Sequence, residues 1–166
     1  MTRNNWLMFV VAAASGSVLT YGRISHAFDR RQSAAFCAQV TGSMYMSMQA
    51  TVESNSSSGS AYVVCPIIDD DLMRYWQVAQ VNVHGRDDST GAQAGVQACS
   101  SPMNFDQTQE RCGAQATSGI GFVGEFTLNP DLTEWRQNVT DYPYLYVVLP
   151  PHASSLSELR GYWYFN

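Results

Sequence analysis

Residues 142–149 read Tyr-Pro-Tyr-Leu-Tyr-Val-Val-Leu, and Pro150 and Pro151 follow directly. Aromatic and β-branched residues are enriched in strands, whereas a proline cannot donate to the hydrogen-bond ladder of a sheet. The segment therefore predicts a β-strand that ends at the proline pair.

Other segments on both sides carry a similar signal. Residues 61–68 are rich in β-branched and aromatic side chains, and Pro66 marks a strand end or an edge. Apolar and polar residues alternate in 73–84 and in 120–128, which is the period of a half-buried strand. The alternation of three methionines favours a strand over a helical turn in 44–52. The predicted strands are 44–52, 61–68, 73–84, 94–99, 120–128, 142–149 and 159–165.

The segments between these strands are predicted to be turns and loops. We expect a lead-in loop in 28–43, a turn in 85–91, and polar loops in 53–60 and 100–118. Residues 131–137 fit one helical turn, and no long helical period follows residue 27. About seven strands with closely spaced turns predict an all-β fold, a single-domain, jelly-roll-like β-sandwich over residues 28–166.

The overall composition excludes two broad classes of protein. The chain has 166 residues, 45% of them hydrophobic, which is too apolar for an intrinsically disordered protein. Nine arginines and no lysine stand against 14 acidic residues, a formal net charge of -5. Such a balance argues against nucleic acid as a partner, because phosphate binding needs a basic face.

Residues 1–27 have the pattern of a secretory signal peptide. Arg3 precedes the apolar run 6–14, and Ser25-His26-Ala27 offers small residues for cleavage after Ala27; a cut within 14–17 is the alternative. A membrane anchor is the other interpretation, but residues 15–17 interrupt the run well short of the ~20 that a spanning helix needs. We expect a secreted protein, extracellular or periplasmic, with no membrane span after removal of the leader.

Four cysteines follow the predicted leader, an even number that implies disulfide bonds in an oxidising compartment. Pairs Cys37–Cys65 and Cys99–Cys112 are favoured because both close short loops, although four cysteines allow three connectivities. Each bond is expected to stabilise the fold by roughly 2–4 kcal/mol. A zinc site is disfavoured, since the chain has no C-x-x-C and no histidine at ligand spacing.

Aromatic residues are the sequence feature that points toward binding. Three consecutive rings near the C-terminus must point to alternate faces of a strand, so at least one lies off the core. Exposed flat rings stack on sugars or anchor a protein partner, while the alternative is that they fill the core. Seven rings are concentrated on three predicted strands, one of them Tyr142; the candidate ligand-binding residues are the other six, Trp76, Tyr144, Tyr146, Tyr162, Trp163 and Tyr164.

Two acidic clusters are candidate Ca²⁺ ligands, because Ca²⁺ takes six to eight oxygen ligands. They are Asp69, Asp70 and Asp71, and Asp87 and Asp88. Neither has the D-x-D-x-D-G spacing of a preformed loop, so solvated turns are the alternative. No other cofactor is expected.

Residues 119–124 match the dinucleotide motif G-x-G-x-x-G, but they lie within a strand pattern instead of before a helix. We expect the glycines to allow a bend or a bulge there.

Catalytic motifs are absent from the sequence. There is no G-x-S-x-G or H-E-x-x-H, and His84 and His152 are the histidines left after the leader. A triad can still assemble in space, and Glu125 with an aspartate would suit glycoside hydrolysis, but no spacing singles out a pair.

One family resemblance rests on short motifs spread over most of the chain. Val63-Val64-Cys65-Pro66-Ile67 gives V-x-C-P-I, and Leu149-Pro150-Pro151 gives a closing L-P-P before a last strand with Gly161-Tyr162. In this respect the chain resembles a group of small exported bacterial proteins of unknown function. The resemblance implies a secreted β-sandwich and no activity. In that group a cysteine often precedes the final L-P-P, whereas this chain has valines there and Cys112 stands as the alternative partner of Cys99.

These features together favour an exported, non-enzymatic β-sandwich that binds polysaccharide or another cell-surface component. One alternative is a structural subunit of a cell-surface or extracellular assembly, in which edge strands pair between copies. A secreted hydrolase is the second alternative.

Overall fold

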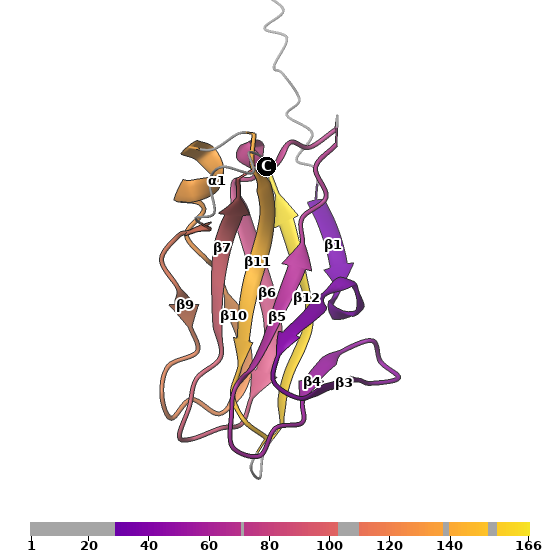
Figure 1. Ribbon diagram of the computed structural model, residues 1–166, viewed down its shortest axis with the longest axis vertical. Helices are drawn as coiled ribbons and strands as arrows, with labels where there is room; N and C mark the ends of the chain where they lie inside the picture. The colour runs from indigo at the N-terminus through magenta and orange to yellow at the C-terminus, as the bar shows by residue number, and fades with distance from the viewer. Residues whose placement is uncertain (1–28, 71, 103–109, 138–139, 153–155) are drawn as a thin grey trace, which may run out of the picture.

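Two antiparallel β-sheets packed face to face form the body of the protein in the computed structural model (Figure 1). The structure describes residues 29–70, 72–102, 110–137, 140–152 and 156–166. The predicted leader and Asp71 lie outside the described residues. The predicted all-β sandwich is confirmed, with twelve strands in the described part of the chain in place of about seven.

The first sheet has the order β10-β6-β12-β4-β3, and β1 also pairs with β12. These strands are β1 (Asp29–Ser33), β3 (Met44–Met46), β4 (Val52–Ser54), β6 (Gln80–Asp87), β10 (Gly124–Leu128) and β12 (Ser157–Phe165). The second sheet has the order β2-β5-β11-β7-β8, and β9 also pairs with β7. Its strands are β2 (Ala38–Thr41), β5 (Ala61–Pro66), β7 (Gly95–Ser101), β8 (Arg111–Cys112), β9 (Ala116–Thr117) and β11 (Tyr142–Leu149).

The strands from β4 to β12 pair in a nested way. The first of them, β4, pairs with the last, β12; β5 pairs with β11, β6 with β10, and β7 with β8 and β9. Such nesting arises when one long antiparallel ribbon rolls up into two sheets, which is the jelly-roll arrangement. The strands β1, β2 and β3 add to the edges of this roll.

Alternating side chains of the central strands fill the space between the sheets. In β11 the residues Leu145, Val147 and Leu149 are buried, and they are neighbours of buried β5 and β7 residues across the sheet. Tyr162 and Tyr164 of β12 close the core from the other sheet. Successive residues of these strands therefore point in turn to the core and to the outer face of the sheet.

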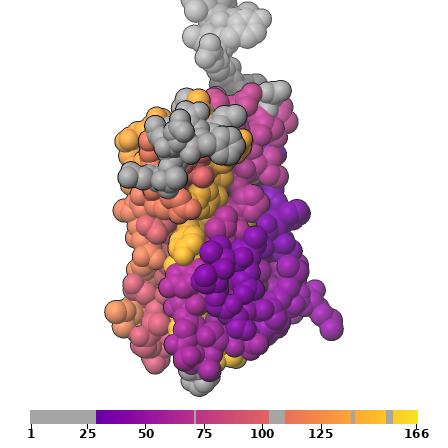
Figure 2. Space-filling model, in the orientation of Figure 1, coloured from indigo at the N-terminus to yellow at the C-terminus, as the bar shows by residue number. Residues whose placement is uncertain are grey.

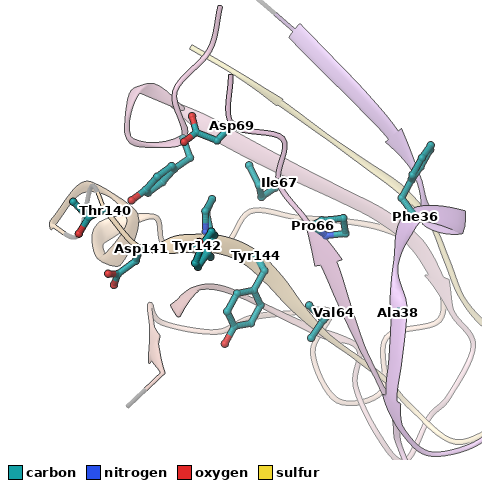
Figure 3. Close-up of a pocket in the computed structure, with 12 residues that line it drawn as sticks. Phe36, Ala38, Val64, Pro66, Ile67, Asp69, Thr140, Asp141, Tyr142 and Tyr144 are labelled. Carbon is teal, nitrogen blue, oxygen red and sulfur yellow. The ribbon is translucent and has the colours of Figure 1, made fainter. Parts of the chain in front are cut away.

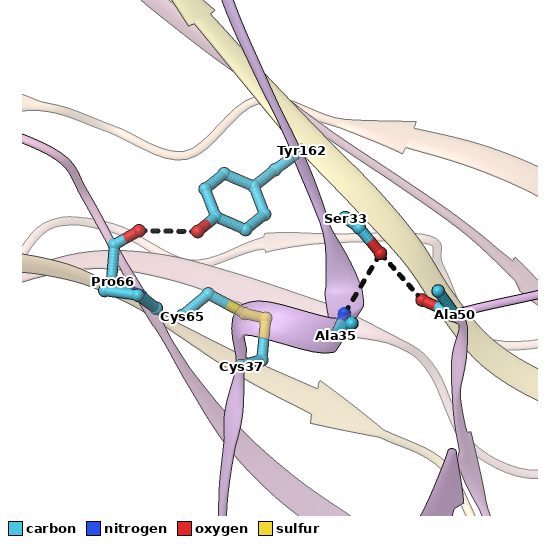
Figure 4. Close-up of a disulfide and its surroundings, with 7 residues drawn as sticks. All are labelled: Ser33, Ala35, Cys37, Ala50, Cys65, Pro66 and Tyr162. Atoms are coloured by element: carbon cyan, nitrogen blue, oxygen red, sulfur yellow. Dashed lines mark hydrogen bonds between the residues drawn. A yellow bond between two sulfur atoms is a disulfide. The ribbon is translucent and has the colours of Figure 1, made fainter. Parts of the chain in front are cut away.

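Both predicted disulfide bonds, Cys37–Cys65 and Cys99–Cys112, are confirmed. The first joins the start of β2 to β5, and Ser33 beside it accepts a hydrogen bond from the Ala35 amide and donates one to the Ala50 carbonyl (Figure 4). The second joins two paired positions of β7 and β8.

The interval 73–91 differs from the prediction. The chain turns through the 3₁₀ helix η2 (Tyr75–Gln77), and strand β6 then runs on through Gly85 to Asp87, where a turn was expected. A side chain at Gly85 would clash, since its Cβ would lie 2.3 Å from the Glu158 carbonyl oxygen. The buried Asp87 carboxylate accepts hydrogen bonds from the Ser89 and Ala94 amides and so stabilises the turn that follows β6.

Three further stretches can be compared with the prediction. Residues 28–43 are not a lead-in loop, because β1 pairs with β12 and β2 with β5. The helical turn expected in 131–137 is present as α1 (Thr133–Gln137). The glycine motif forms a turn that leads into β10, with positive φ at Gly119, Gly121 and Gly124, so the expected bend is present. The strand predicted over 120–128 begins only at Gly124.

Within the described ranges, α1 is the one α-helix, and no helix there is long and apolar enough to cross a membrane.

Candidate functional site

The candidate aromatic residues divide among three environments. On β11, Tyr142, Tyr144 and Tyr146 point to the outer face of the second sheet, since the residues between them and after them face the core. Trp163 lies on the outer face of the first sheet. Trp76 lies half-buried in η2, edge-on to Tyr75 at 5.2 Å and beneath the Arg74 guanidinium.

Two of the candidates, Tyr162 and Tyr164, are wrong as exposed ligand-binding residues. Both are at most 2% exposed and stack on each other within the core. The Tyr162 hydroxyl donates to the Pro66 carbonyl (Figure 4), and the Tyr164 hydroxyl accepts from the Ile68 amide. Because β12 is a central strand, every second ring must face the opposing sheet, and Trp163 is the ring of this run that lies off the core.

A cleft of about 720 Å³ opens at one end of the outer face of the second sheet (Figure 3). We call it the tyrosine cleft. Its lining residues are Phe36, Ala38, Val64, Pro66, Ile67, Asp69, Tyr75, Thr140, Asp141, Tyr142, Pro143 and Tyr144.

The strand register places the wall of the tyrosine cleft. Pro66 lies opposite Tyr144, and Val64 lies opposite Ala38, so outward side chains of β2, β5 and β11 meet there. Tyr142, which is 60% exposed, lies at the start of β11 and offers its ring to solvent. The result is an apolar and aromatic wall on a rigid sheet.

Polar groups gather at one end of the cleft, where Asp69, Thr140 and Asp141 lie, while Phe36 lies at the opposite end (Figure 3). The Asp141 carboxylate accepts a hydrogen bond from the Ser100 hydroxyl at 3.2 Å, and Asp69 lies 3.9 Å from the Arg74 guanidinium. Oxygen acceptors beside flat rings can bind ligand hydroxyls while the rings cover an apolar ligand face.

Two tyrosines of the cleft, Tyr75 and Tyr144, have raised pKa values. Burial, and then the nearby Asp141 and Asp69 carboxylates, raise the pKa of Tyr75 to about 12. Burial and the Glu110 carboxylate likewise raise the pKa of Tyr144 to about 12. Their hydroxyls can therefore donate hydrogen bonds at any pH at which the protein is expected to work.

Several cleft residues were not among the sequence candidates. Tyr75 is adjacent to Trp76 in the sequence, but it is Tyr75 that lines the cleft. Asp141 precedes a predicted strand, and such a position at a strand end is a signal that sequence reasoning could have used. Tyr62 stacks on Tyr146 at 5.7 Å and extends the aromatic surface of the sheet beyond the cleft.

The outer face of the first sheet is polar and contains one stacked pair of rings. His84 stacks on Trp163 with 3.8 Å between ring centroids, and its Nδ1 lies 2.9 Å from the Thr127 hydroxyl. Its Nε2 is buried with no hydrogen-bond partner among the described residues. Burial lowers the pKa of His84, because the charged ring would lose solvation.

Stability is expected to fall when the pH decreases below about 6.5, the ordinary pKa of histidine. In that range the unfolded chain binds the His84 proton more strongly than the folded chain, so protonation favours unfolding. The effect should stay below about 1 kcal/mol, since the ring is half-buried and solvent screens its charge. On the flanking strands β10 and β12, Glu125 and Arg160 form an ion pair at 2.6 Å.

Urea unfolding at pH 7.5 and pH 5.5 measures this dependence. His84→Gln should reduce the difference between the two pH values, whereas a change at the exposed His152 should leave it as in the wild type. An equal difference in the wild type and in His84→Gln would show that other groups cause the pH dependence.

Glu125, the carboxylate considered for glycoside hydrolysis, lies in an ion-pair network on this face. Arg160 binds both Glu125 and Glu158, each at 2.6 Å. The Arg160 guanidinium holds the pKa of Glu125 below its ordinary value, which is opposite to what a general acid needs. Glu158 lies directly opposite Glu53 on β4, and the Tyr45 hydroxyl donates to Glu53.

The described aspartates do not form the predicted calcium site. Asp70 accepts bonds from the Met73 and Leu72 amides and pairs with Arg30, contacts that lower its pKa. Asp87 is fully buried and Asp88 binds Arg86 at 2.8 Å.

The two acidic clusters also lie near opposite ends of β12. Ser157 pairs with Asp87, while Tyr164 contacts Ile68 beside the first cluster, and seven residues of strand span about 23 Å. In the part of the chain that the structure describes, no three histidine, cysteine, aspartate or glutamate side chains come together as metal ligands.

No protein-family model matches this chain, and no curated protein sequence matches it at a significant level. The geometry of the chain's own residues is therefore the basis for a function.

Proposed function

We propose that the protein is an exported, non-enzymatic binding module that holds a polysaccharide in the tyrosine cleft. The observation that carries this proposal is the cleft itself, because aromatic rings and acidic oxygens line one hollow of about 720 Å³. Small-molecule sites commonly have 300–1,000 Å³ and an apolar lining with a few polar groups, and the cleft fits both criteria.

Sugars are the ligand class that this lining fits best. A pyranose ring has an apolar face of C–H groups and a rim of hydroxyls, so it needs both flat rings and hydrogen-bond acceptors. The rings of Tyr142 and Tyr144 supply the first, and Asp69 and Asp141 supply the second. The cleft is open to solvent at the exposed ring of Tyr142, which allows a polymer to extend beyond the site.

Export is the part of this proposal that rests on the cysteines. All four pair in disulfide bonds, and disulfides persist in oxidising compartments such as the periplasm and the extracellular space. The leader pattern in 1–27 and the resemblance to small exported bacterial proteins point in the same direction. A polysaccharide of the cell surface or its surroundings is accordingly the partner that we expect.

Affinity gel electrophoresis tests the binding proposal with soluble neutral polysaccharides such as glucan, xylan and mannan cast in the gel. We expect at least one of them to retard the wild-type protein. Tyr142→Ala should weaken that retardation at least tenfold, because it removes a cleft ring that is 60% exposed and available to a ligand.

Two aromatic variants outside the cleft are the controls. Tyr45→Ala removes a ring that is 49% exposed, and Trp163→Ala removes the ring on the opposite sheet. Both should bind as the wild type does. Loss of retardation in Trp163→Ala with normal binding of Tyr142→Ala would assign the ligand to the other face, and no retardation by any polymer would contradict the proposal.

A further inference from the structure

The open edges of the two sheets lie side by side along one flank of the sandwich. β2 ends the order of the second sheet and β3 ends that of the first, and residues 42–43 alone connect them. Gly42 makes this turn possible, since φ is +88° and a Cβ there would lie 2.7 Å from the Ala61 Cα. We call residues 38–49 the edge strip; in Figures 1 and 2 its hairpin side projects from the lower right of the molecule.

The edge strip exposes a concentration of large apolar side chains. Exposed fractions are 50% for Val40, 49% for Tyr45, 55% for Met46 and 106% for Met48. A standard interface buries roughly 800 Å² on each partner, and its centre is formed by exposed apolar side chains such as these four.

The edge strip also has no charged side chain, although the chain has a net charge of -5. No aspartate, glutamate, lysine or arginine occurs between Gln32 and Val52. The edge strands β1, β8 and β10 all contain charged residues, which is how proteins usually protect sheet edges. Two acidic copies of this chain can therefore approach each other most closely at the edge strip.

A protruding side chain and a groove that fits it occur together on this flank. Met48 projects from the tip of the β3–β4 hairpin and is fully exposed. Between β2 and β3 lies an apolar groove of about 190 Å³, far more than a single water needs. It is lined by Cys37, Gln39, Met44, Tyr45, Met46, Val52 and Val63.

We propose that two copies of this chain associate through the edge strip, with Met48 of each copy inserted into the groove between β2 and β3 of the other. Met48 and the groove lie on the same flank of the molecule. A two-fold axis beside this flank therefore lets Met48 of each copy enter the groove of the other, which gives a closed dimer. Methionine suits this role because its unbranched side chain adapts to irregular apolar grooves.

Side chains carry this contact more than backbone pairing does. The register of β2 against β5 shifts between Gln39 and Thr41, and β3 is three residues long. Both features limit the number of strand hydrogen bonds that a second copy can add. The groove shares no lining residue with the tyrosine cleft, so the dimer can be tested whether or not the protein binds polysaccharide.

Sedimentation equilibrium of the purified protein over 1–300 μM tests the proposal. We expect a concentration-dependent shift from monomer to dimer in the wild type. Met48→Glu should raise the dissociation constant at least tenfold, because it places a carboxylate in the apolar groove. Ile120→Glu is the matched control, since Ile120 is 78% exposed outside the edge strip, and it should dimerise as the wild type does.

Oxidation of Met48 provides a second readout that needs no substitution. Hydrogen peroxide transfers one oxygen atom to an accessible thioether, and peptide mass spectrometry measures the sulfoxide. Its formation at Met48 should slow at least fivefold as the protein concentration rises past the dissociation constant. A strictly monomeric protein at 300 μM, or equal weakening by Met48→Glu and Ile120→Glu, would overturn the proposal.

Discussion

Trp135→Ala is expected to lower the free energy of unfolding by about 4 kcal/mol, the largest effect of a single substitution considered for this protein. Trp135 is the buried residue of α1, with 0% exposure, and α1 packs against β7 and η2. Its indole Nε1 donates a hydrogen bond of 2.7 Å to the Cys99 carbonyl. Alanine leaves a large cavity and an unsatisfied carbonyl at the same place.

Trp135→Phe separates these two contributions. Phenylalanine keeps most of the apolar volume but lacks the N–H donor, so a loss of about 1–3 kcal/mol is expected. Urea unfolding followed by circular dichroism gives all three free energies. Trp76→Phe is the control for a change of tryptophan to phenylalanine, because Trp76 is only half-buried and lies in η2, which contacts α1. A Trp135→Ala protein as stable as the wild type would show that α1 does not contribute to the cooperative core.

The same substitution should weaken ligand binding in the tyrosine cleft. α1 contacts η2, which carries Tyr75, and the cleft residue Asp141 lies between α1 and β11 in the chain. Loss of Trp135 would remove support from this end of the cleft.

Removal of the Cys37–Cys65 bond by a double alanine variant should cost about 3.5 kcal/mol. The bond closes a loop with a sequence separation of 28, whereas Cys99–Cys112 has a separation of 13. A longer loop loses more entropy in the unfolded chain, so the second double variant should cost less, about 3 kcal/mol. Thermal unfolding should show a decrease of about 10 °C or more for the first variant.

This disulfide also supports both proposed binding surfaces. Cys37 lies between Phe36 and Ala38, which line the tyrosine cleft, and directly precedes β2, which belongs to the edge strip. The Cys37–Cys65 double variant should therefore bind polysaccharide more weakly and dimerise more weakly. The Cys99–Cys112 double variant should bind and dimerise as the wild type does. Equal melting temperatures for the wild type and the first variant would contradict the expected stabilisation.

The sequence predicted strands well where β-branched and aromatic residues are concentrated or where a proline ends the segment. The predicted strands 61–68, 94–99 and 142–149 correspond to β5, β7 and β11, whereas the alternating segments 73–84 and 120–128 form strands only in part, as β6 and β10. Both disulfide pairs followed from loop length alone. Period and spacing are local properties, so the sequence displays them directly.

Prediction failed where a long-range contact decides the local structure. Residues 85–88 have the composition of a turn, yet β6 continues there. Gly85 fits closely against Phe126 and Glu158, and the buried Asp87 carboxylate has hydrogen-bond donors within the fold. In 28–43 no period is visible, yet β1 and β2 form because β12 and β5 offer open edges. Such pairing depends on partners far away in the sequence.

The sequence by itself determined an all-β sandwich joined by two disulfides, because side-chain alternation and cysteine spacing are encoded within short segments. Only the tertiary structure decided which tyrosines line a cleft and which fill the core. Tyr144 and Tyr164 stand in similar aromatic strands, but the first lines the cleft on the outer face and the second faces the opposing sheet. That choice follows from how the rolled ribbon stacks its two sheets, and no local pattern contains it.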